Sequence, residues 1–177
     1  VVVDPVMVAE SGARLLPPDA ERALAELILP RATVATPNVP EARALARSGR
    51  SGATRDGADG ADGAAADELA RAVQRLGPRA VVVTGGHREQ AVDVFFDGQR
   101  VVEIPGERHP DGAAHGSGCT HSSTLAARLA LGDDPLEAAR AAKQAASDAV
   151  RDGLRELGAG PGPVDVLGLR GAGVALP

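Results

Sequence analysis

Residues 115–131 read HGSGCTHSSTLAARLAL, and this stretch determines how the rest of the chain is interpreted. Gly116 and Gly118 flank Ser117 and allow a tight turn, and a segment of helical composition follows directly. The first N–H groups of a helix have no partners inside the helix, and the helix dipole is positive at that end. The pattern therefore predicts an anion site at the start of a helix, where the thiolate form of Cys119 would be favoured.

An ordinary loop followed by a helix N-cap explains the same residues, and the spacing alone favours that explanation. The phosphate-binding pattern G-x-x-x-x-G-K-[ST] is absent, because no lysine follows the second glycine. Support for a phosphate site must therefore come from other parts of the chain.

The composition describes a domain of moderate size. The chain has 177 residues, a net charge of −5 and a single Cys, which excludes an internal disulfide framework and indicates a reducing compartment. The 19 Lys and Arg residues are scattered and two Phe are the only aromatic residues, so we expect no nucleic-acid partner. No apolar run reaches the roughly 18 residues of a membrane span. We expect no membrane partner and a cytoplasmic location, and a homo-oligomer is left open.

Short continuous apolar runs alternate along the chain with longer runs that have apolar residues at helical spacing, which predicts alternating strands and helices. Short apolar runs at 1–3, 32–35 and 80–83 are typical of buried strands, and longer periodic runs lie between them. This order implies right-handed βαβ units, and therefore an α/β fold with a mostly parallel sheet and helices on both faces. Asp97-Gly98 separates two further apolar runs, 91–96 and 100–104, and predicts a hairpin that extends the edge of the sheet.

Helices are predicted near both ends of the chain, and two segments are expected to lack regular structure. The first, ending at Pro30, has apolar residues at helical spacing: Ala20, Ala23, Leu24, Leu27 and Ile28. The last is expected to run from Asp134-Pro135 to Leu157. Residues 48–63 are rich in Gly, Ala and Asp and are interpreted as a flexible surface insertion, and residues 166–177 as a frayed tail.

Polar and glycine residues follow each predicted parallel strand. Asp4 follows the first strand, Asn38 and Glu41 follow the second, and Thr84-Gly85-Gly86 follow the third. Open α/β sheets bind ligands at the carboxyl ends of their strands, so we expect these residues to gather there with residues 116–119. Asn38 and Glu41 also have a structural explanation, since their spacing is that of a capping box.

Four motifs, in chain order, resemble those of the hydroxymethylpyrimidine and phosphomethylpyrimidine kinases, the thiamine-pathway branch of the ribokinase-like superfamily. They are Val1-Val2-Val3-Asp4-Pro5-Val6-Met7 followed by Ser11-Gly12, Thr36-Pro37-Asn38 with Glu41, Thr84-Gly85-Gly86-His87, and His115-Gly116-Ser117-Gly118-Cys119-Thr120. The last motif has Ser117 where the family has Thr. Upstream of it, Ala113-Ala114 replace a common Asn-Thr, and near the end of the chain Asp165 replaces the usual His.

The resemblance implies ATP-dependent phosphorylation of hydroxymethylpyrimidine, of its monophosphate, or of both. It implies that Cys119 is the base and that Gly116, Ser117 and Gly118 stabilise the transferred phosphoryl group. The nucleotide would lie beside Asn38, Thr84, Gly85, Gly86 and Lys143, although a solvated surface position explains Lys143 equally well. Asp4 and Glu41 would hold Mg²⁺, which commonly keeps several waters and needs few carboxylates.

Three alternatives stay open. Pyridoxal kinases and hydroxyethylthiazole kinases share the fold and the chemistry. A zinc site or a Cys-His nucleophile is a different use of His109, His115, Cys119 and His121. Finally, the strand matching 1–3 lies mid-chain in the family, so we interpret residues 1–177 as a single partial kinase domain whose N-terminal strands are missing. Such a chain would have no enzymatic activity on its own.

Overall fold

The computed structural model describes residues 1–7, 13–48, 65–85, 91–157, 159–160 and 162–169. The chain divides into two compact units, Val1–Pro105 and Gly106–Pro177, and each is described by itself. The expected insertion at 48–63 lies outside the described residues except for Ser48, as do residues 170–177 of the expected tail. No helix in the described ranges is both long and apolar enough to cross a membrane.

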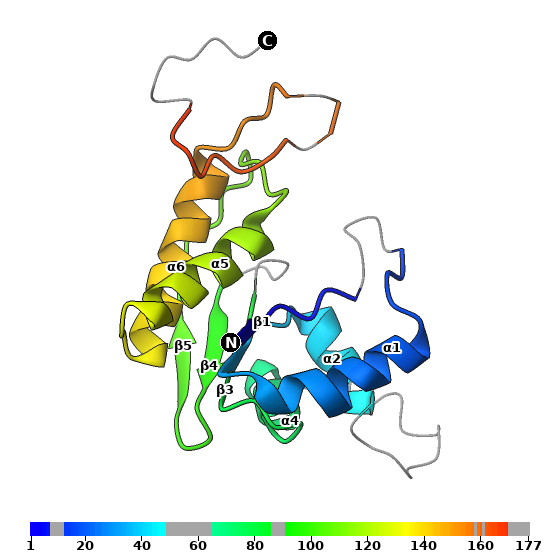
Figure 1. Ribbon diagram of the computed structural model, residues 1–177. Helices are drawn as coiled ribbons and strands as arrows, with labels where there is room; N and C mark the ends of the chain where they lie inside the picture. The colour runs from blue at the N-terminus through cyan, green and yellow to red at the C-terminus, as the bar shows by residue number, and fades with distance from the viewer. Residues whose placement is uncertain (8–12, 49–64, 86–90, 158, 161, 170–177) are drawn as a thin grey trace. The chain divides into compact units, whose positions relative to one another are not determined.

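Unit 1 is built on a sheet whose strands follow one another in chain order (Figure 1). β1 (Val2–Val3), β2 (Val34–Ala35) and β3 (Ala80–Val83) are parallel, which confirms the expected α/β arrangement. β4 (Asp93–Phe96) runs antiparallel to β3, and β5 (Val101–Ile104) runs antiparallel to β4 at the end of the strand order. The hairpin predicted from Asp97-Gly98 is therefore confirmed at the sheet edge.

The hairpin turn has a clear local cause. Gly98 has φ of 92°, a conformation that favours glycine. The Asp97 carboxylate accepts hydrogen bonds from the N–H groups of Gln99 (3.0 Å) and Arg100 (2.9 Å). These donors lower the pKa of Asp97, the Arg100 N–H most of all. Two adjacent residues thus specify where β4 ends.

The helical segments of unit 1 pack on one face of its sheet. They are α1 (Pro18–Ala23), the π-helical turn η1 (Leu24–Ile28), the 3₁₀ turn η2 (Leu29–Arg31), α2 (Val39–Ser48) and α4 (Ala66–Gln74). The core combines apolar residues of η1, η2, α2 and α4 with Val3, Ala35, Val81, Val83, Val94 and Phe96, which the strand register places on the same side of the sheet. This core explains how the short strands β1 and β2 are held in place.

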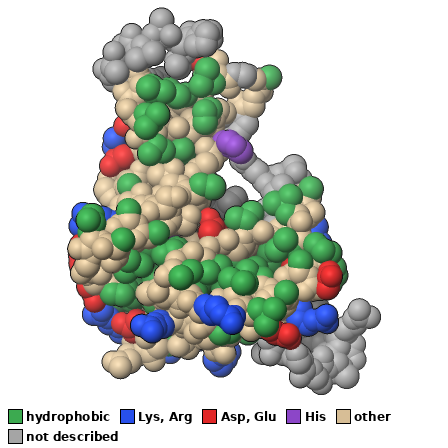
Figure 2. Space-filling model, viewed as in Figure 1, with side chains coloured by type: hydrophobic (Ala, Val, Ile, Leu, Met, Phe, Trp, Pro, Cys, Tyr) green, Lys and Arg blue, Asp and Glu red, His purple; other side chains and the backbone are tan. Residues whose placement is uncertain are grey.

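The inward face predicted for the first helix is partly wrong. Leu27 and Ile28 are 56% and 46% exposed, whereas Ala25 and Leu29 are buried. The cause is η1, in which the N–H of Leu29 donates to the carbonyl of Leu24, five residues back. A π turn takes one more residue than an α turn, so it shifts the buried face along the sequence. Figure 2 shows hydrophobic side chains at the surface over this part of unit 1.

Unit 2 contains two helices that pack against each other, α5 (Ser117–Ala130) and α6 (Pro135–Arg151). The Asp134 side chain caps α6 by accepting a hydrogen bond from the N–H of Leu136 (3.0 Å). α6 ends at Arg151, and the expected extension to Leu157 is wrong because the backbone turns at Gly153 to lie against Ala113. A Cβ on Gly153 would lie only 2.5 Å from the Cβ of Ala113. The second helix layer expected on the sheet stays a prediction, since α5 and α6 belong to unit 2.

Candidate functional site

In unit 1, the carboxyl ends of the parallel strands bring sequence-distant residues together. The N–H of Thr36 donates to the carbonyl of Val3 (2.9 Å), and the N–H of Thr84 donates to the carbonyl of Pro37 (2.9 Å). Asn38 and Thr84 form an isolated parallel bridge just beyond the ends of β2 and β3. Residues that the sequence placed after separate strands therefore lie side by side at one end of the sheet.

Glu41 is bonded to two segments at this end of the sheet. Its Oε2 accepts a hydrogen bond from the N–H of Asn38 (2.9 Å), and the N–H of Glu41 donates to Oδ1 of Asn38 (2.9 Å). This reciprocal pair is the predicted capping box at the start of α2. The other oxygen, Oε1, accepts from the N–H of Met7 at 3.4 Å. Glu41 thus links the segment after β1 to the start of α2.

The Glu41 carboxylate lies in a buried and negatively charged environment. Only 4% of the residue is exposed, and this burial raises the pKa of its carboxyl group. The N–H groups of Asn38 and Met7 oppose the shift, and the charge of Asp4 adds to it. Of these causes, burial has the largest effect and the charge of Asp4 the smallest.

The loop after β3 is fixed by a residue that sequence reasoning missed. The N–H of Gly85 donates to Oδ1 of Asp93 on β4 at 2.9 Å, and Asp93 is 1% exposed. A Cβ on Gly85 would lie 1.9 Å from the carbonyl oxygen of Val92, so this position requires glycine. The available signal was an acidic residue inside the apolar run of β4. Gly86 and His87, the remaining residues of the motif, lie outside the described residues.

In unit 2, residues 115–131 form the predicted glycine turn and helix. Gly116 is the N-cap of α5 with φ of 91°, and no side chain caps this end of the helix. The N–H of Ser117 donates to the carbonyl of Ala114 (3.0 Å), and the N–H of Thr120 donates to that of Gly116 (2.9 Å).

Gly118 and Cys119, the next two residues, lie in the first turn of α5. Between Ser117 and Thr120, the N–H groups of Gly118 and Cys119 belong to the first helical turn, where no intrahelical carbonyl is available. The Cys119 side chain is exposed. An exposed thiol thus stands in the first turn of α5, as predicted.

Two further segments of unit 2 hold this turn. The N–H of Val164 donates to the carbonyl of His115 (2.9 Å), and the N–H of His115 donates to that of Gly162 (3.4 Å). On the other side, the N–H of Ala113 donates to the carbonyl of Val150 in α6 (3.2 Å), and Ala113 is completely buried. The two alanines at 113–114 therefore do not leave the turn unsupported.

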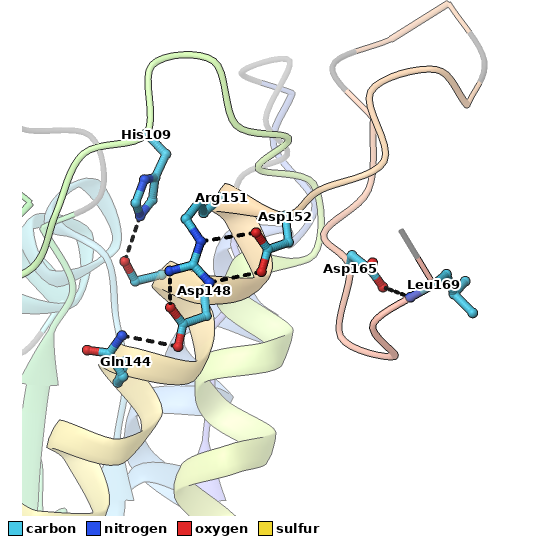
Figure 3. A network of polar contacts seen from close by, with 8 residues as sticks. His109, Gln144, Asp148, Arg151, Asp152, Asp165 and Leu169 are labelled. Atoms are coloured by element: carbon cyan, nitrogen blue, oxygen red, sulfur yellow. Dashed lines mark hydrogen bonds and ion pairs between the residues drawn. The ribbon is translucent and has the colours of Figure 1, made fainter. Parts of the chain in front are cut away.

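Figure 3 shows polar contacts of unit 2 along α6, between α6 and the segment before the turn, and near the end of the described chain. The ring Nε2 of His109 lies 2.9 Å from the Ser147 hydroxyl on α6. One turn on, Arg151 pairs with Asp148 (2.6 Å) and Asp152 (2.9 Å) near the end of the helix. Asp165, at the position where the family usually has His, accepts a hydrogen bond from the N–H of Leu169 (3.0 Å).

The zinc alternative and the predicted role of Lys143 both concern residues of unit 2. Among the residues that the structure describes, no three His, Cys, Asp or Glu side chains are grouped to hold a metal ion, and zinc at His109, His115, Cys119 and His121 stays an untested alternative. Lys143 is half-buried on α6 beside the buried Ala142. Its place beside the nucleotide stays a prediction, as does the meeting of residues 116–119 with the strand ends of unit 1.

Comparison with known proteins identifies the family. The family model for phosphomethylpyrimidine kinase matches residues 1–165. The chain belongs to the phosphomethylpyrimidine kinase family. A hydroxymethylpyrimidine/phosphomethylpyrimidine kinase from Rhizobium meliloti is 45% identical over 171 residues, which cover 92% of this chain and 59% of that protein. Family membership confirms the resemblance drawn from the four motifs.

Vitamin kinases with other substrates are also similar to this family member. A pyridoxine kinase from Bacillus subtilis is 37% identical over 155 residues, covering 86% of this chain and 54% of that protein. The structure of Staphylococcus aureus pyridoxal kinase with AMP-PCP and pyridoxal superposes with a TM-score of 0.74 at 30% identity, over 93% of this chain and 56% of that one. The chain thus spans little more than half the length of these relatives, and the ribokinase-like α/β fold is confirmed.

Proposed function

We propose that the protein containing residues 1–177 transfers the γ-phosphoryl group of ATP to hydroxymethylpyrimidine, to its monophosphate, or to both, in the cytoplasm. An acceptor oxygen, either the hydroxyl oxygen of hydroxymethylpyrimidine or a phosphate oxygen of its monophosphate, attacks the γ-phosphorus, and the bond from that phosphorus to ADP breaks. When the acceptor is the alcohol, the hydroxyl proton passes to a base. The group that accepts the phosphoryl is a primary alcohol or an existing phosphate on a small pyrimidine.

The observation that carries the proposal is the glycine turn at the start of α5. Gly116 has no side chain to cover the end of the helix, and no other side chain caps it. The N–H groups of Gly118 and Cys119 therefore suit the equatorial oxygens of a phosphoryl group, whose charge they would stabilise during transfer. An AMP-PCP complex of the similar pyridoxal kinase supports the choice of ATP as donor.

Cys119 is the residue we propose as the base. Its side chain is exposed in the first turn of α5, beside the N–H groups of Gly118 and Cys119 that we assign to the phosphoryl group. It would accept the proton as the hydroxyl oxygen forms its bond to phosphorus. In this assignment the turn supplies both the stabilising amides and the proton acceptor.

Asp4 and Glu41 fit Mg²⁺ by the chemistry of their oxygens. The two carboxylates interact electrostatically, and Mg²⁺ prefers a small number of carboxylates with water completing its shell. When bound, the ion would neutralise charge on the ATP phosphates. Glu41 is already held by the N–H groups of Asn38 and Met7, so its carboxylate would be oriented before the ion arrives. Thr84, Gly85, Gly86 and Asn38 are the residues we propose beside the nucleotide.

The second candidate function is phosphorylation of pyridoxal or a related vitamin B6 alcohol. The Bacillus subtilis pyridoxine kinase and the Staphylococcus aureus pyridoxal complex favour it specifically, since both are similar over most of the chain. Both proteins are less similar than the Rhizobium meliloti kinase, which is 45% identical. We therefore keep the pyrimidine as the preferred substrate.

A substrate panel tests the proposal. The whole protein is incubated with MgATP and, separately, hydroxymethylpyrimidine, its monophosphate, pyridoxal and hydroxyethylthiazole, and ADP formation is measured. We expect the highest kcat/KM with one or both pyrimidines. A preference for pyridoxal would establish the second candidate instead. If none of the four releases ADP and the protein carries stoichiometric zinc, the kinase assignment is wrong.

A further inference from the structure

Asp93 is a buried acid in a strand that otherwise reads as apolar. β4 has the sequence DVFF, and all of its residues are buried. Asp93 itself is only 1% exposed, and its Oδ1 accepts the hydrogen bond from the N–H of Gly85 at 2.9 Å. A carboxylate in such a place loses its hydration, whereas an apolar residue would pack there without that loss. Packing of the strand therefore does not explain the acid.

The bond from Asp93 completes the support of the segment that follows β3. On one side, the N–H of Thr84 donates to the carbonyl of Pro37 at 2.9 Å. On the other, the next N–H along the chain, that of Gly85, donates to Asp93. The N–H of Thr84 is thus bonded on the side of β3 that faces β2, and the N–H of Gly85 on the side that faces β4.

Gly85 is confined by contact as well as by hydrogen bonding. Its Cα faces the Val92 carbonyl oxygen so closely that a Cβ would lie 1.9 Å away. Val92 precedes Asp93 directly, so residues 92–93 provide both the acceptor for the Gly85 N–H and the close steric contact with the Gly85 Cα. The peptide between Thr84 and Gly85 is therefore fixed in orientation by residues 92–93.

We propose that Asp93 is a positioning residue for nucleotide binding, which it supports by fixing the Thr84–Gly85 peptide at the end of β3. This inference rests on the proposed function, in which Thr84 and Gly85 lie beside the ATP phosphates. Asp93 makes no contact with the reactants in this assignment. Its effect falls on the affinity for the nucleotide and leaves the affinity for the pyrimidine unchanged.

The test compares three variants of the whole protein. Asp93→Ala removes the acceptor, Asp93→Asn keeps an oxygen that can accept from the Gly85 N–H, and Asp97→Ala is the matched control. Asp97 lies just beyond the other end of β4 and also accepts backbone N–H groups, but at the hairpin turn. For each variant, KM for ATP, KM for the pyrimidine and kcat are measured, with MgADP affinity by calorimetry.

We expect Asp93→Ala to raise KM for ATP and the Kd of MgADP roughly tenfold to a hundredfold, the range for one hydrogen bond to a charged group. KM for the pyrimidine should not change. Asp93→Asn should restore most of the nucleotide affinity, and Asp97→Ala should leave it at the wild-type value. If Asp93→Ala does not fold, Asp93→Val replaces it, because a β-branched side chain fills the buried strand position.

Three results would overturn the inference. One is a folded Asp93→Ala or Asp93→Val variant with wild-type affinity for MgADP. Another is an equal rise in KM for both substrates, which indicates a general loss of structure. The third is an Asp97→Ala variant with the same nucleotide defect. A wild-type protein that binds MgADP but phosphorylates no substrate would instead overturn the proposed function, and the calorimetric comparison would still test Asp93.

Discussion

Replacing Gly116 with alanine tests the phosphate turn most directly. Gly116 has φ of 91°, and a Cβ there would lie 3.4 Å from Val164 Cγ2, which is ordinary contact. The cost therefore comes from the backbone conformation and not from a clash. Left-handed backbone costs a residue with a Cβ about 1–2 kcal/mol. We expect Gly116→Ala to lower the free energy of unfolding by about that amount.

The other end of the same helix offers a matched control. Gly132 follows α5, has φ of 97°, and a Cβ there would meet nothing within 4 Å. Gly132→Ala should therefore cost the same about 1–2 kcal/mol for the same reason. If the amides after Gly116 bind phosphate, only Gly116→Ala should also weaken nucleotide binding, by at least about tenfold, or 1.4 kcal/mol, because the turn relaxes toward another conformation.

Denaturant unfolding and calorimetric titration with MgAMP-PCP, which keeps a γ-phosphoryl group, both on the whole protein, measure the two effects separately. Equal losses of stability with a selective loss of MgAMP-PCP affinity in Gly116→Ala would support the reasoning. If the two variants bind MgAMP-PCP equally well while both are destabilised, the start of α5 is a structural turn and the site of the γ-phosphoryl group lies elsewhere.

Three further predictions concern other residues. Cys119→Ala should lower kcat roughly 10²–10⁴-fold, the usual value of proton-transfer assistance, with MgADP affinity within about twofold of wild type, and an unchanged kcat would remove Cys119 from the mechanism. Because burial raises the pKa of Glu41, protons should compete with Mg²⁺ at higher pH than for an ordinary glutamate, so Mg²⁺ affinity should fall as pH falls through that raised pKa. Glu41→Gln should weaken Mg²⁺ binding and abolish this pH dependence, and a dependence that persists would assign it to another group. Leu29→Ala should lower the free energy of unfolding by about 2–5 kcal/mol and Leu27→Ala by less than about 0.5 kcal/mol, whereas the reverse order in thermal or denaturant melts would show that η1 is α-helical.

The parts of the fold that sequence predicted are those with short-range causes. The hairpin follows from Asp97-Gly98, whose side chain and backbone conformation form the turn by themselves. The capping box of Asn38 and Glu41 likewise involves residues three apart. The glycine turn before α5 was recognisable because Gly116 supplies a conformation that other residues avoid.

The parts that sequence did not predict depend on contacts between distant residues. The π turn η1 has no local signal in Leu24–Ile28, and a helical period assumed for that segment places Leu27 and Ile28 inside. The end of α6 depends on the packing of Gly153 against Ala113, about forty residues earlier in the chain. Asp93 was missed because its partner, the N–H of Gly85, is a backbone group that no side-chain motif encodes.

The bonds of Glu41 give the proposed magnesium site a thermodynamic link to the chain around it. One carboxylate accepts N–H groups from both Met7 and Asn38, and the longer of the two bonds, at 3.4 Å, is the one to Met7. Met7 in turn accepts a hydrogen bond from the N–H of Leu15 (2.8 Å). If Mg²⁺ draws on the same oxygens, ion binding and the backbone contacts of Met7 influence each other by equal free energies. Weakening the hydrogen bond between Leu15 and Met7 would therefore weaken ion binding, even though neither residue is a ligand of the ion.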